Sequence, residues 1–277
     1  MNPYVHGENI RQKLVSAKSA DTVTMLKEIE AEYNQWKSSS ESIVGNSEKV
    51  VARKVSLLNQ YKDFIDQPKF KKIGGNPHGF SPQSKLHSSV IEEFCYYLFK
   101  DIPCLQDGVI LLGPTMLYLD MGFAPRNLHA LKTDPKIDLK QKHQDFALSK
   151  EIFLKFSADN RVFKNENICV PAVSVECKTY LPITMLDQSA YEAERLKRGN
   201  PYSLYIILAE TNALTDDVIL KHTKIDQAFI LRKQKRDAKP RKPIDAEVVF
   251  EFFKMVENFL GEDWRKIDAT ERGKLIG

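Results

Sequence analysis

Apolar side chains recur at three- and four-residue intervals in two N-terminal stretches, a spacing that predicts amphipathic helices. Asp21 is a candidate cap for the first helix and Ser47 for the second, and a cluster rich in glycine at 74–79 ends the region. The apolar positions are Met25, Leu26, Ile29, Tyr33 and Trp36 in the first stretch, and Val51, Val55, Leu58, Tyr61 and Ile65 in the second. We therefore expect residues 1–80 to form a helical accessory region.

Beyond residue 80, helical and strand-like patterns alternate. A serine followed by a proline at 81–82 predicts the start of a helix that runs to about Lys100. Apolar runs that predict strands follow at 108–112, 116–123, 145–156, 168–179 and 202–210, with a helix at 185–198 and a last helix at about 245–260. This order predicts a mixed α/β core over residues 81–277 that ends in a C-terminal helix.

The composition is that of a globular protein. Of 277 residues, 42% are hydrophobic and 28% are charged, which excludes a disordered chain, a collagen-like repeat and a small disulfide scaffold. The net charge of +4 is too small to indicate a partner. The basic residues are concentrated, however, between Arg232 and Lys242, where seven of them accompany one acidic residue. Such a local excess needs a partner or a structural reason.

Several signals are absent from the sequence. The first residues do not resemble a secretory leader, and no apolar run approaches the roughly 20 residues of a membrane-spanning helix, so we expect a cytoplasmic protein without a membrane partner. The spacing of the four cysteines fits no zinc site, and free thiols are typical of a reducing compartment. No glycine-rich phosphate loop occurs.

The segment 170–178 carries the strongest chemical signal. In a strand, alternate side chains share a face, so Glu176 and Lys178 point together away from the apolar face that Cys177 shares. Upstream, Asp145 begins another apolar run. Two carboxylates can hold Mg²⁺, which polarises a phosphoryl oxygen and activates a bound water, while a lysine stabilises the developing negative charge. This set of residues suits phosphodiester hydrolysis.

Taken alone, a Glu-x-Lys pattern is weak, and a surface ion pair is the alternative interpretation. The related Asp-x-Lys patterns at 134–136, 138–140 and 237–239 lie in polar stretches that we interpret as solvated loops. On a helical wheel, Glu93 falls on the apolar stripe of the helix that precedes the strands, whereas Glu92 falls outside it. A carboxylate on such a stripe is costly without a metal or cation partner, although it could also reach solvent at the stripe's edge.

An acidic residue on a helix, an acidic residue on a strand and a Glu-x-Lys pattern, in this order, form the layout of the PD-(D/E)XK nuclease core. Short segments in the same order make the resemblance more specific: 91–94, 143–146, 171–178, 185–187, 193–198, 201–205, 209–210, 225–226, 230–232, 243–245 and 272–274. In these segments the chain resembles type II restriction endonucleases of the PD-(D/E)XK superfamily, and among them the larger subunit of BbvCI. The resemblance covers about residues 85–275.

The resemblance implies a bacterial enzyme that uses Mg²⁺ to cut double-stranded DNA at a short, near-palindromic site. By this resemblance, Asp145 and Glu176 are metal ligands together with the backbone carbonyl of Cys177, Lys178 is the catalytic lysine, and Glu93 is an auxiliary acid. The first motif has His143 and Gln144 before Asp145, without the proline of the superfamily name. We expect Mn²⁺ to substitute for Mg²⁺, and Ca²⁺ to support DNA binding without cleavage.

Because one catalytic centre cuts one strand, the resemblance also implies a homodimer or a heterodimer with a related subunit. Two alternatives remain open: a repair or recombination nuclease that recognises DNA structure, and a DNA-binding subunit of a heteromeric endonuclease. For phosphate contacts we expect three basic residues on the helix after Glu176 and four in the basic loop at 232–242. The alternatives are compensation of the helix dipole for the first group and a solvated loop for the second. These candidates are Arg195, Lys197, Arg198, Arg232, Lys233, Lys235 and Arg236. The lysine series 132, 136, 140 and 142 is a weaker candidate for the same role.

Overall fold

A computed structural model describes residues 2–72, 79–80, 85–158, 161–215, 218, 220–262 and 264. The helix start predicted at 81–82, most of the glycine-rich cluster at 74–79 and the segment 272–274 that contributes to the family resemblance lie outside these residues. Within the described residues, no helix is long and apolar enough to cross a membrane.

The predicted mixed α/β class is confirmed. The helices are α1 Val5–Ser16, α2 Ala20–Ser42, α3 Glu48–Ile65, α4 Lys85–Phe99, α5 Leu128–Thr133, α6 Ile183–Gly199 and α7 Ala246–Gly261. The strands are β1 Leu111–Phe123, β2 Ile137–Ala158, β3 Arg161–Leu181, β4 Leu204–Asn212 and β5 Gln227–Ile230, and they form one sheet in the order β1-β2-β3-β4-β5. β1, β2 and β3 pair antiparallel, whereas β3, β4 and β5 pair parallel.

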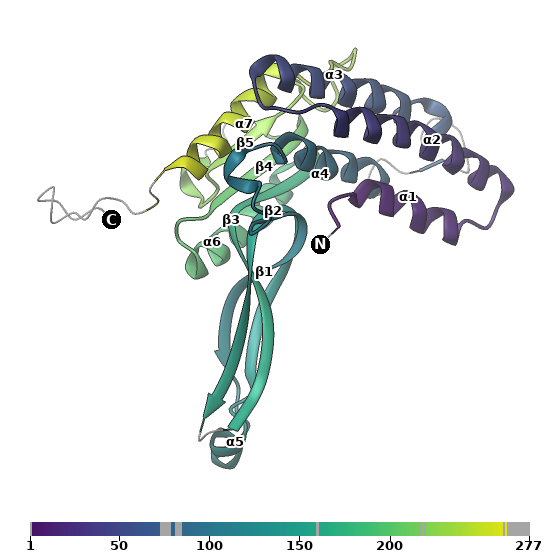
Figure 1. Cartoon of the computed structure of the whole chain (residues 1–277). Coiled ribbons are helices and arrows are strands. Elements are labelled where there is room, and N and C mark those ends of the chain that lie inside the picture. Colours follow the sequence, from purple (N-terminus) through teal and green to yellow (C-terminus); the bar gives the residue numbers. More distant parts are fainter. Residues whose placement is uncertain are drawn as a thin grey trace, which may run out of the picture.

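Each face of the central sheet is covered by helices. The apolar side chains of β3 at Val173, Val175 and Cys177 pack into a core with α4 and α7, and α6 packs with a second apolar cluster on the opposite face. The N-terminal helices α1–α3 extend the first core, because their apolar stripes pack on α4 and α7 (Figure 1). Trp36 of α2 stacks on Tyr61 of α3 within this core.

Two details of the N-terminal region differ from the sequence analysis. Helix α2 begins one residue before the predicted cap, and the hydroxyl of Ser19, rather than Asp21, accepts the capping hydrogen bond from the Thr22 amide. Helix α1 was not predicted, since its apolar residues are too few to form a clear stripe. Its residues His6, Gly7 and Ile10 are nevertheless buried.

The strands β1, β2 and β3 extend as long ribbons away from the helices, with α5 near their far end (Figure 1). This extension corrects one interpretation, because Asp138 and Lys140 lie in β2 rather than in a loop, although both side chains are exposed and form an ion pair at 2.6 Å. A parallel bridge joins Leu117 of β1 to Cys169 of β3. The end of the ribbons that lies against the helices carries the residues of the candidate site.

Candidate active site

The strand pair β2–β3 brings the predicted acid, glutamate and lysine together. Asp145 Oδ2 accepts a hydrogen bond from the backbone amide of Cys177 at 2.9 Å, which fixes the aspartate beside the end of β3. Lys178 Nζ donates to Glu176 Oε1 at 2.5 Å and lies 3.9 Å from Asp145 Oδ2. The three side chains thus form one charged cluster.

An extra residue in β2 explains how Asp145 reaches this position. In the β1–β2 register, Gly113 pairs with Ala147 and Thr115 pairs with Gln144, so two steps along β1 correspond to three along β2. A bulge of this kind interrupts the alternation of faces and turns a side chain in a new direction. Asp145 lies within the bulged segment, beyond the last β2–β3 pair at Phe146.

A pocket of about 500 Å³ opens at this cluster. Asp145 and Lys178 line it together with His143 of β2, and helix α4 contributes Lys85, Ser88 and Glu92. Helix α1 closes another side of the pocket with Val5, Glu8, Asn9 and Gln12. The pocket therefore lies between the sheet edge and two helices, one of which belongs to the N-terminal region.

Of the two adjacent glutamates on α4, the structure places Glu92 and not Glu93 in the pocket, which corrects the assignment of Glu93 as auxiliary acid. Glu93 is fully buried on the side of α4 that faces the N-terminal helices. Its carboxylate accepts hydrogen bonds from the hydroxyls of Tyr33 at 2.9 Å and Tyr97 at 2.7 Å, and from the backbone amides of His6 at 2.9 Å and Gly7 at 3.2 Å.

The helical wheel failed at this point because α4 is covered on both sides. Its apolar stripe marks burial, but burial against α1 and α2 cannot be distinguished on the wheel from burial against the sheet. The one local signal was Tyr97, which lies one turn after Glu93 and donates to it.

The carboxylates of the pocket are held in an environment that disfavours their charge. Burial and the nearby charge of Glu176 raise the pKa of Asp145 to about 6. Burial and the charge of Asp145 raise the pKa of Glu92 to about 8. Two such carboxylates in one pocket gain from any cation that enters it.

Glu176 differs, because two lysines hold it in the ionised form. Lys142 Nζ lies 2.7 Å from Oε2, and Lys178 contacts Oε1. Burial opposes the charge, but the two ammonium groups outweigh it and keep the pKa of Glu176 below its ordinary value. In return, the carboxylates Glu176 and Asp145 outweigh the effect of burial and raise the pKa of Lys178.

Lys142 is the second lysine of the site. Its predicted role was only that of a weaker candidate for a phosphate contact. Besides Glu176, its ammonium group pairs with Glu192 of α6 and donates to the hydroxyl of Tyr205 at 3.2 Å. Gln144 Nε2 donates to Glu176 Oε2 at 3.0 Å. Lys142 and Gln144 therefore fix the orientation of Glu176 from the α6 side.

The basic residues predicted on α6 lie outside the pocket lining and pair with acids of the same chain. Arg195 contacts Asp120 at 3.2 Å. Lys197 donates to both carboxylate oxygens of Asp226 at 2.6 Å. Arg198 contacts Glu194 one turn earlier and keeps 72% of its side chain exposed.

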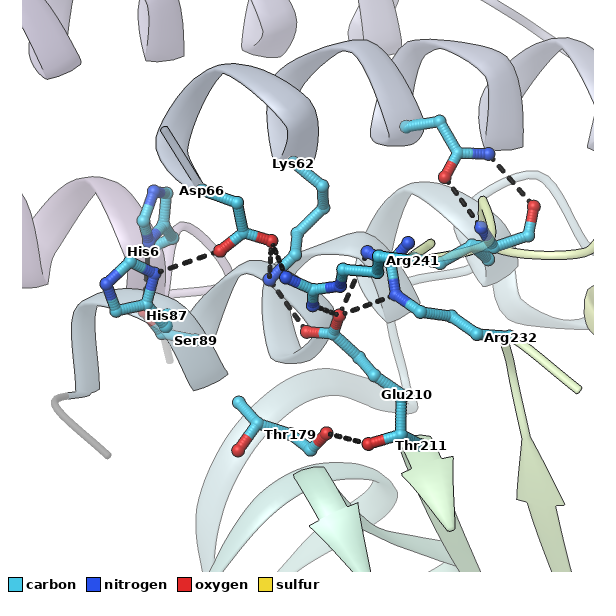
Figure 2. Close-up of polar contacts among 12 residues, drawn as sticks. His6, Lys62, Asp66, His87, Ser89, Thr179, Glu210, Thr211, Arg232 and Arg241 are labelled. Carbon is cyan, nitrogen blue, oxygen red and sulfur yellow. Dashed lines mark hydrogen bonds and ion pairs between the residues drawn. The ribbon is translucent and has the colours of Figure 1, made fainter. Parts of the chain in front are cut away.

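The basic loop divides into residues that point inward and residues that remain exposed. Arg232 is 2% exposed, and its Nε donates to Glu210 Oε2 at 3.0 Å, so the structure corrects its assignment as a DNA-binding residue. Figure 2 shows Arg232, Arg241 and Lys62 gathered around Glu210, with Asp66 beside them.

Among the exposed residues of the loop, Arg236 contacts a residue of the pocket lining. Its guanidinium group lies 3.7 Å from the ring centre of Tyr180, which lines the pocket. Lys233 pairs with Asp245 at 3.0 Å and Glu247 at 3.1 Å. Lys235 Nζ donates to the carbonyl of Leu214 at 2.7 Å.

A mixed sheet with helices on both faces, and with an Asp, a Glu and a Lys at one edge, defines a restriction-endonuclease-like fold. The family model of the Bpu10I restriction endonuclease matches residues 83–247, which is more than half of the chain. The chain belongs to this family and is therefore a site-specific nuclease of the type II restriction class.

A solved structure is similar over nearly the full length. The structure described as the native BbvCI A2B2 tetramer at low resolution has a TM-score of 0.70 and 19% sequence identity, and the match covers 93% of this chain and 95% of that one. This similarity bears out the fold. No curated protein sequence matches the chain significantly.

Proposed function

We propose that this restriction endonuclease uses Mg²⁺ to cut double-stranded DNA at a short, near-palindromic site. The observation that carries the proposal is the convergence of Asp145, Glu92 and Lys178 on one open pocket, with Glu176 in contact with Lys178. Carboxylates beside a lysine are the groups that hydrolysis of a phosphodiester requires.

The donor set of the pocket fits a divalent cation. Asp145 and Glu176 would hold the metal together with the backbone carbonyl of Cys177. Burial raises the pKa values of Asp145 and Glu92, so a cation in the pocket would stabilise their ionised forms. When bound, the metal supplies Lewis-acid activation of the phosphate and of a water molecule.

No ready-made metal cluster of three or more His, Cys, Asp or Glu side chains is present among the described residues. Lys142 and Lys178 contact both carboxylate oxygens of Glu176 in this structure. A metal held by Glu176 would take the place of one of these lysine contacts.

The protein's own groups then have separate tasks. Lys178, held by Glu176 and close to Asp145, places a positive charge where negative charge develops on the phosphate. Glu92 is the proposed auxiliary acid in place of Glu93. Arg236 is the residue of the basic loop best placed to contact a phosphate beside the pocket, since it stacks on Tyr180.

A double-strand cut requires two such pockets, so we propose that the chain acts as a dimer, with a second copy or with a related subunit. The A2B2 arrangement of the similar BbvCI structure supports association with a related subunit. A near-palindromic site would match such a pair, because each half-site then meets a similar surface.

Digestion of a sequenced plasmid by the purified chain, followed by mapping of the ends, tests this proposal. We expect cuts at one short sequence in Mg²⁺ or Mn²⁺, none in EDTA, and none by Lys178→Ala or Glu176→Gln in an assembly of this chain alone. With a related subunit, either variant should nick instead. Cleavage of branched DNA without sequence preference would contradict the proposal, as would normal cutting by either variant.

A further inference from the structure

Helix α1 presents one continuous face to the catalytic pocket. Val5, Glu8, Asn9 and Gln12 line the pocket, and their spacing of three and four residues places them along a single side of the helix. The other side of α1 carries the buried residues His6 and Ile10, which pack among the N-terminal helices. The orientation of α1 therefore follows from its packing, and its polar side is directed at the site.

We propose that this face of α1 contacts the DNA next to the scissile phosphate, with the side-chain amides of Asn9 and Gln12 as the contacting groups. This inference rests on the proposed function, because a phosphate that reaches Asp145 and Lys178 must enter the pocket that α1 also lines. Asparagine and glutamine can donate to phosphate oxygens and can also pair with base edges.

The charge of the face is compatible with DNA. Glu8 is its only ionised residue, and Arg11 of the same helix lies 2.7 Å from the Glu8 carboxylate. Gln12 Nε2 also donates to Glu8, at 3.3 Å. The Glu8 charge is thus largely compensated within the helix, and the amides can approach a phosphate without a strong repulsion.

Glu93 is the residue that positions α1. Its carboxylate accepts hydrogen bonds from two backbone amides at the beginning of α1, at His6 and Gly7, while two tyrosine hydroxyls hold the same carboxylate. Four donors converge on this buried carboxyl group, which fixes the start of α1 relative to α4. Glu92 directly precedes Glu93 on α4, so two adjacent residues hold the pocket acid and the anchor of the α1 wall.

The test compares two double variants of matched composition in the full-length protein. Asn9→Ala with Gln12→Ala removes the two amides from the pocket face, whereas Asn34→Ala with Gln35→Ala removes the same groups from an exposed part of α2. For the first variant we expect about tenfold slower single-turnover cleavage and about tenfold weaker binding of cognate DNA in Ca²⁺, which is the usual effect of losing hydrogen bonds to a charged group. The α2 variant should match the wild type.

Failure of this inference differs from failure of the proposed function. Cleavage and binding of the α1 variant at wild-type levels, while Lys178→Ala is inactive, would overturn the role of α1 and leave the nuclease assignment intact. If the wild type does not cut DNA, the proposed function fails, and the Ca²⁺ binding comparison still decides whether α1 contacts DNA. Absence of any DNA binding would overturn both.

A double-mutant cycle tests the positioning role of Glu93. We expect Glu93→Ala to slow cleavage and to cancel most of the additional loss from Asn9→Ala with Gln12→Ala, because a displaced α1 no longer places the amides. Glu93→Gln, which retains an acceptor oxygen for the two backbone amides, should restore much of the activity. Fully additive effects of the two changes would show that Glu93 only stabilises the fold.

Discussion

Two clusters of buried charge in this protein contain the same kinds of residue and behave in opposite ways. Around Glu210, the cations Lys62, Arg232 and Arg241 outweigh the cost of burial and keep the pKa of this fully buried carboxylate below its ordinary value. In the pocket, burial and mutual repulsion raise the pKa values of Asp145 and Glu92.

The difference lies in the balance of charge. The Glu210 cluster has more cations than carboxylates and joins α3, β4 and the basic loop (Figure 2). In the pocket, the lysines contact Glu176, while burial and neighbouring carboxylates disfavour the ionised forms of Glu92 and Asp145. The cations around Glu210 balance its charge and stabilise the fold, whereas the carboxylates of the pocket lack such a balance and form the proposed cation site.

The largest effect on stability should come from removing the carboxylate charge of the Glu210 cluster. Glu210→Gln leaves Lys62 and Arg232 buried without their partner, so we expect a loss of about 3–5 kcal/mol in the free energy of unfolding, measured by chemical denaturation. As a control, Glu194→Gln removes an exposed carboxylate that is paired with Arg198 and should change stability by less than about 1 kcal/mol. Equal effects of the two variants would contradict the structural role of Glu210.

The same substitution at Glu92 should affect cleavage rather than stability. Glu92→Gln replaces a carboxyl whose ionised form is disfavoured by burial, so we expect unchanged or higher thermal stability, together with cleavage slower by about 10- to 100-fold. The exposed Glu251 on α7 provides the control, and Glu251→Gln should leave both properties unchanged. Wild-type cleavage by Glu92→Gln would remove Glu92 from the site.

A smaller effect should appear in the pH dependence of stability. Glu210 has a lowered pKa in the fold, so it stabilises the protein above its unfolded pKa, and this contribution is lost as the pH falls. Asp145 and Glu92 have raised pKa values of about 6 and about 8, so they bind protons more tightly in the fold, and their contribution falls as the pH rises through this range.

In EDTA, we therefore expect the Tm of Glu92→Gln to fall less than that of the wild type between about pH 5 and about pH 9, by a few degrees. Addition of Ca²⁺ should remove most of this difference, because the cation compensates the same carboxylates. Parallel Tm curves for the two proteins would contradict the raised pKa of Glu92.

Much of the fold and part of the site could be predicted from local pattern. The alternation in β3 separates Glu176 and Lys178 from the apolar residues between them, and the structure has the same separation. The core helices were predicted near their observed positions, and the predicted apolar runs 116–123, 145–156, 168–179 and 202–210 overlap four of the five strands, β1 to β4. The polar extensions of β2 and β3 and the short strand β5 were not predicted, since their residues are too polar or too few to form a pattern.

Other features depended on contacts between distant segments. Glu92 and Glu93 are neighbours in the sequence, and their roles are decided by whether the sheet edge or α1 lies opposite. Arg232 belongs to a basic run, but Glu210, 22 residues earlier, draws it into the interior. Neither partner could be identified from local periodicity.

By itself, the sequence determined which residues alternate on a strand, which stretches bury an apolar stripe, and which acids and lysine stand at the end of a buried run. Each of these follows from the fixed geometry of one helix or strand. The tertiary structure decided which glutamate enters the pocket, that a bulge turns Asp145 into it, and that α1 forms its wall. Burial and charge balance are set by the element that packs opposite, and for Glu93 that element is α1, whose His6 lies 87 residues earlier in the chain.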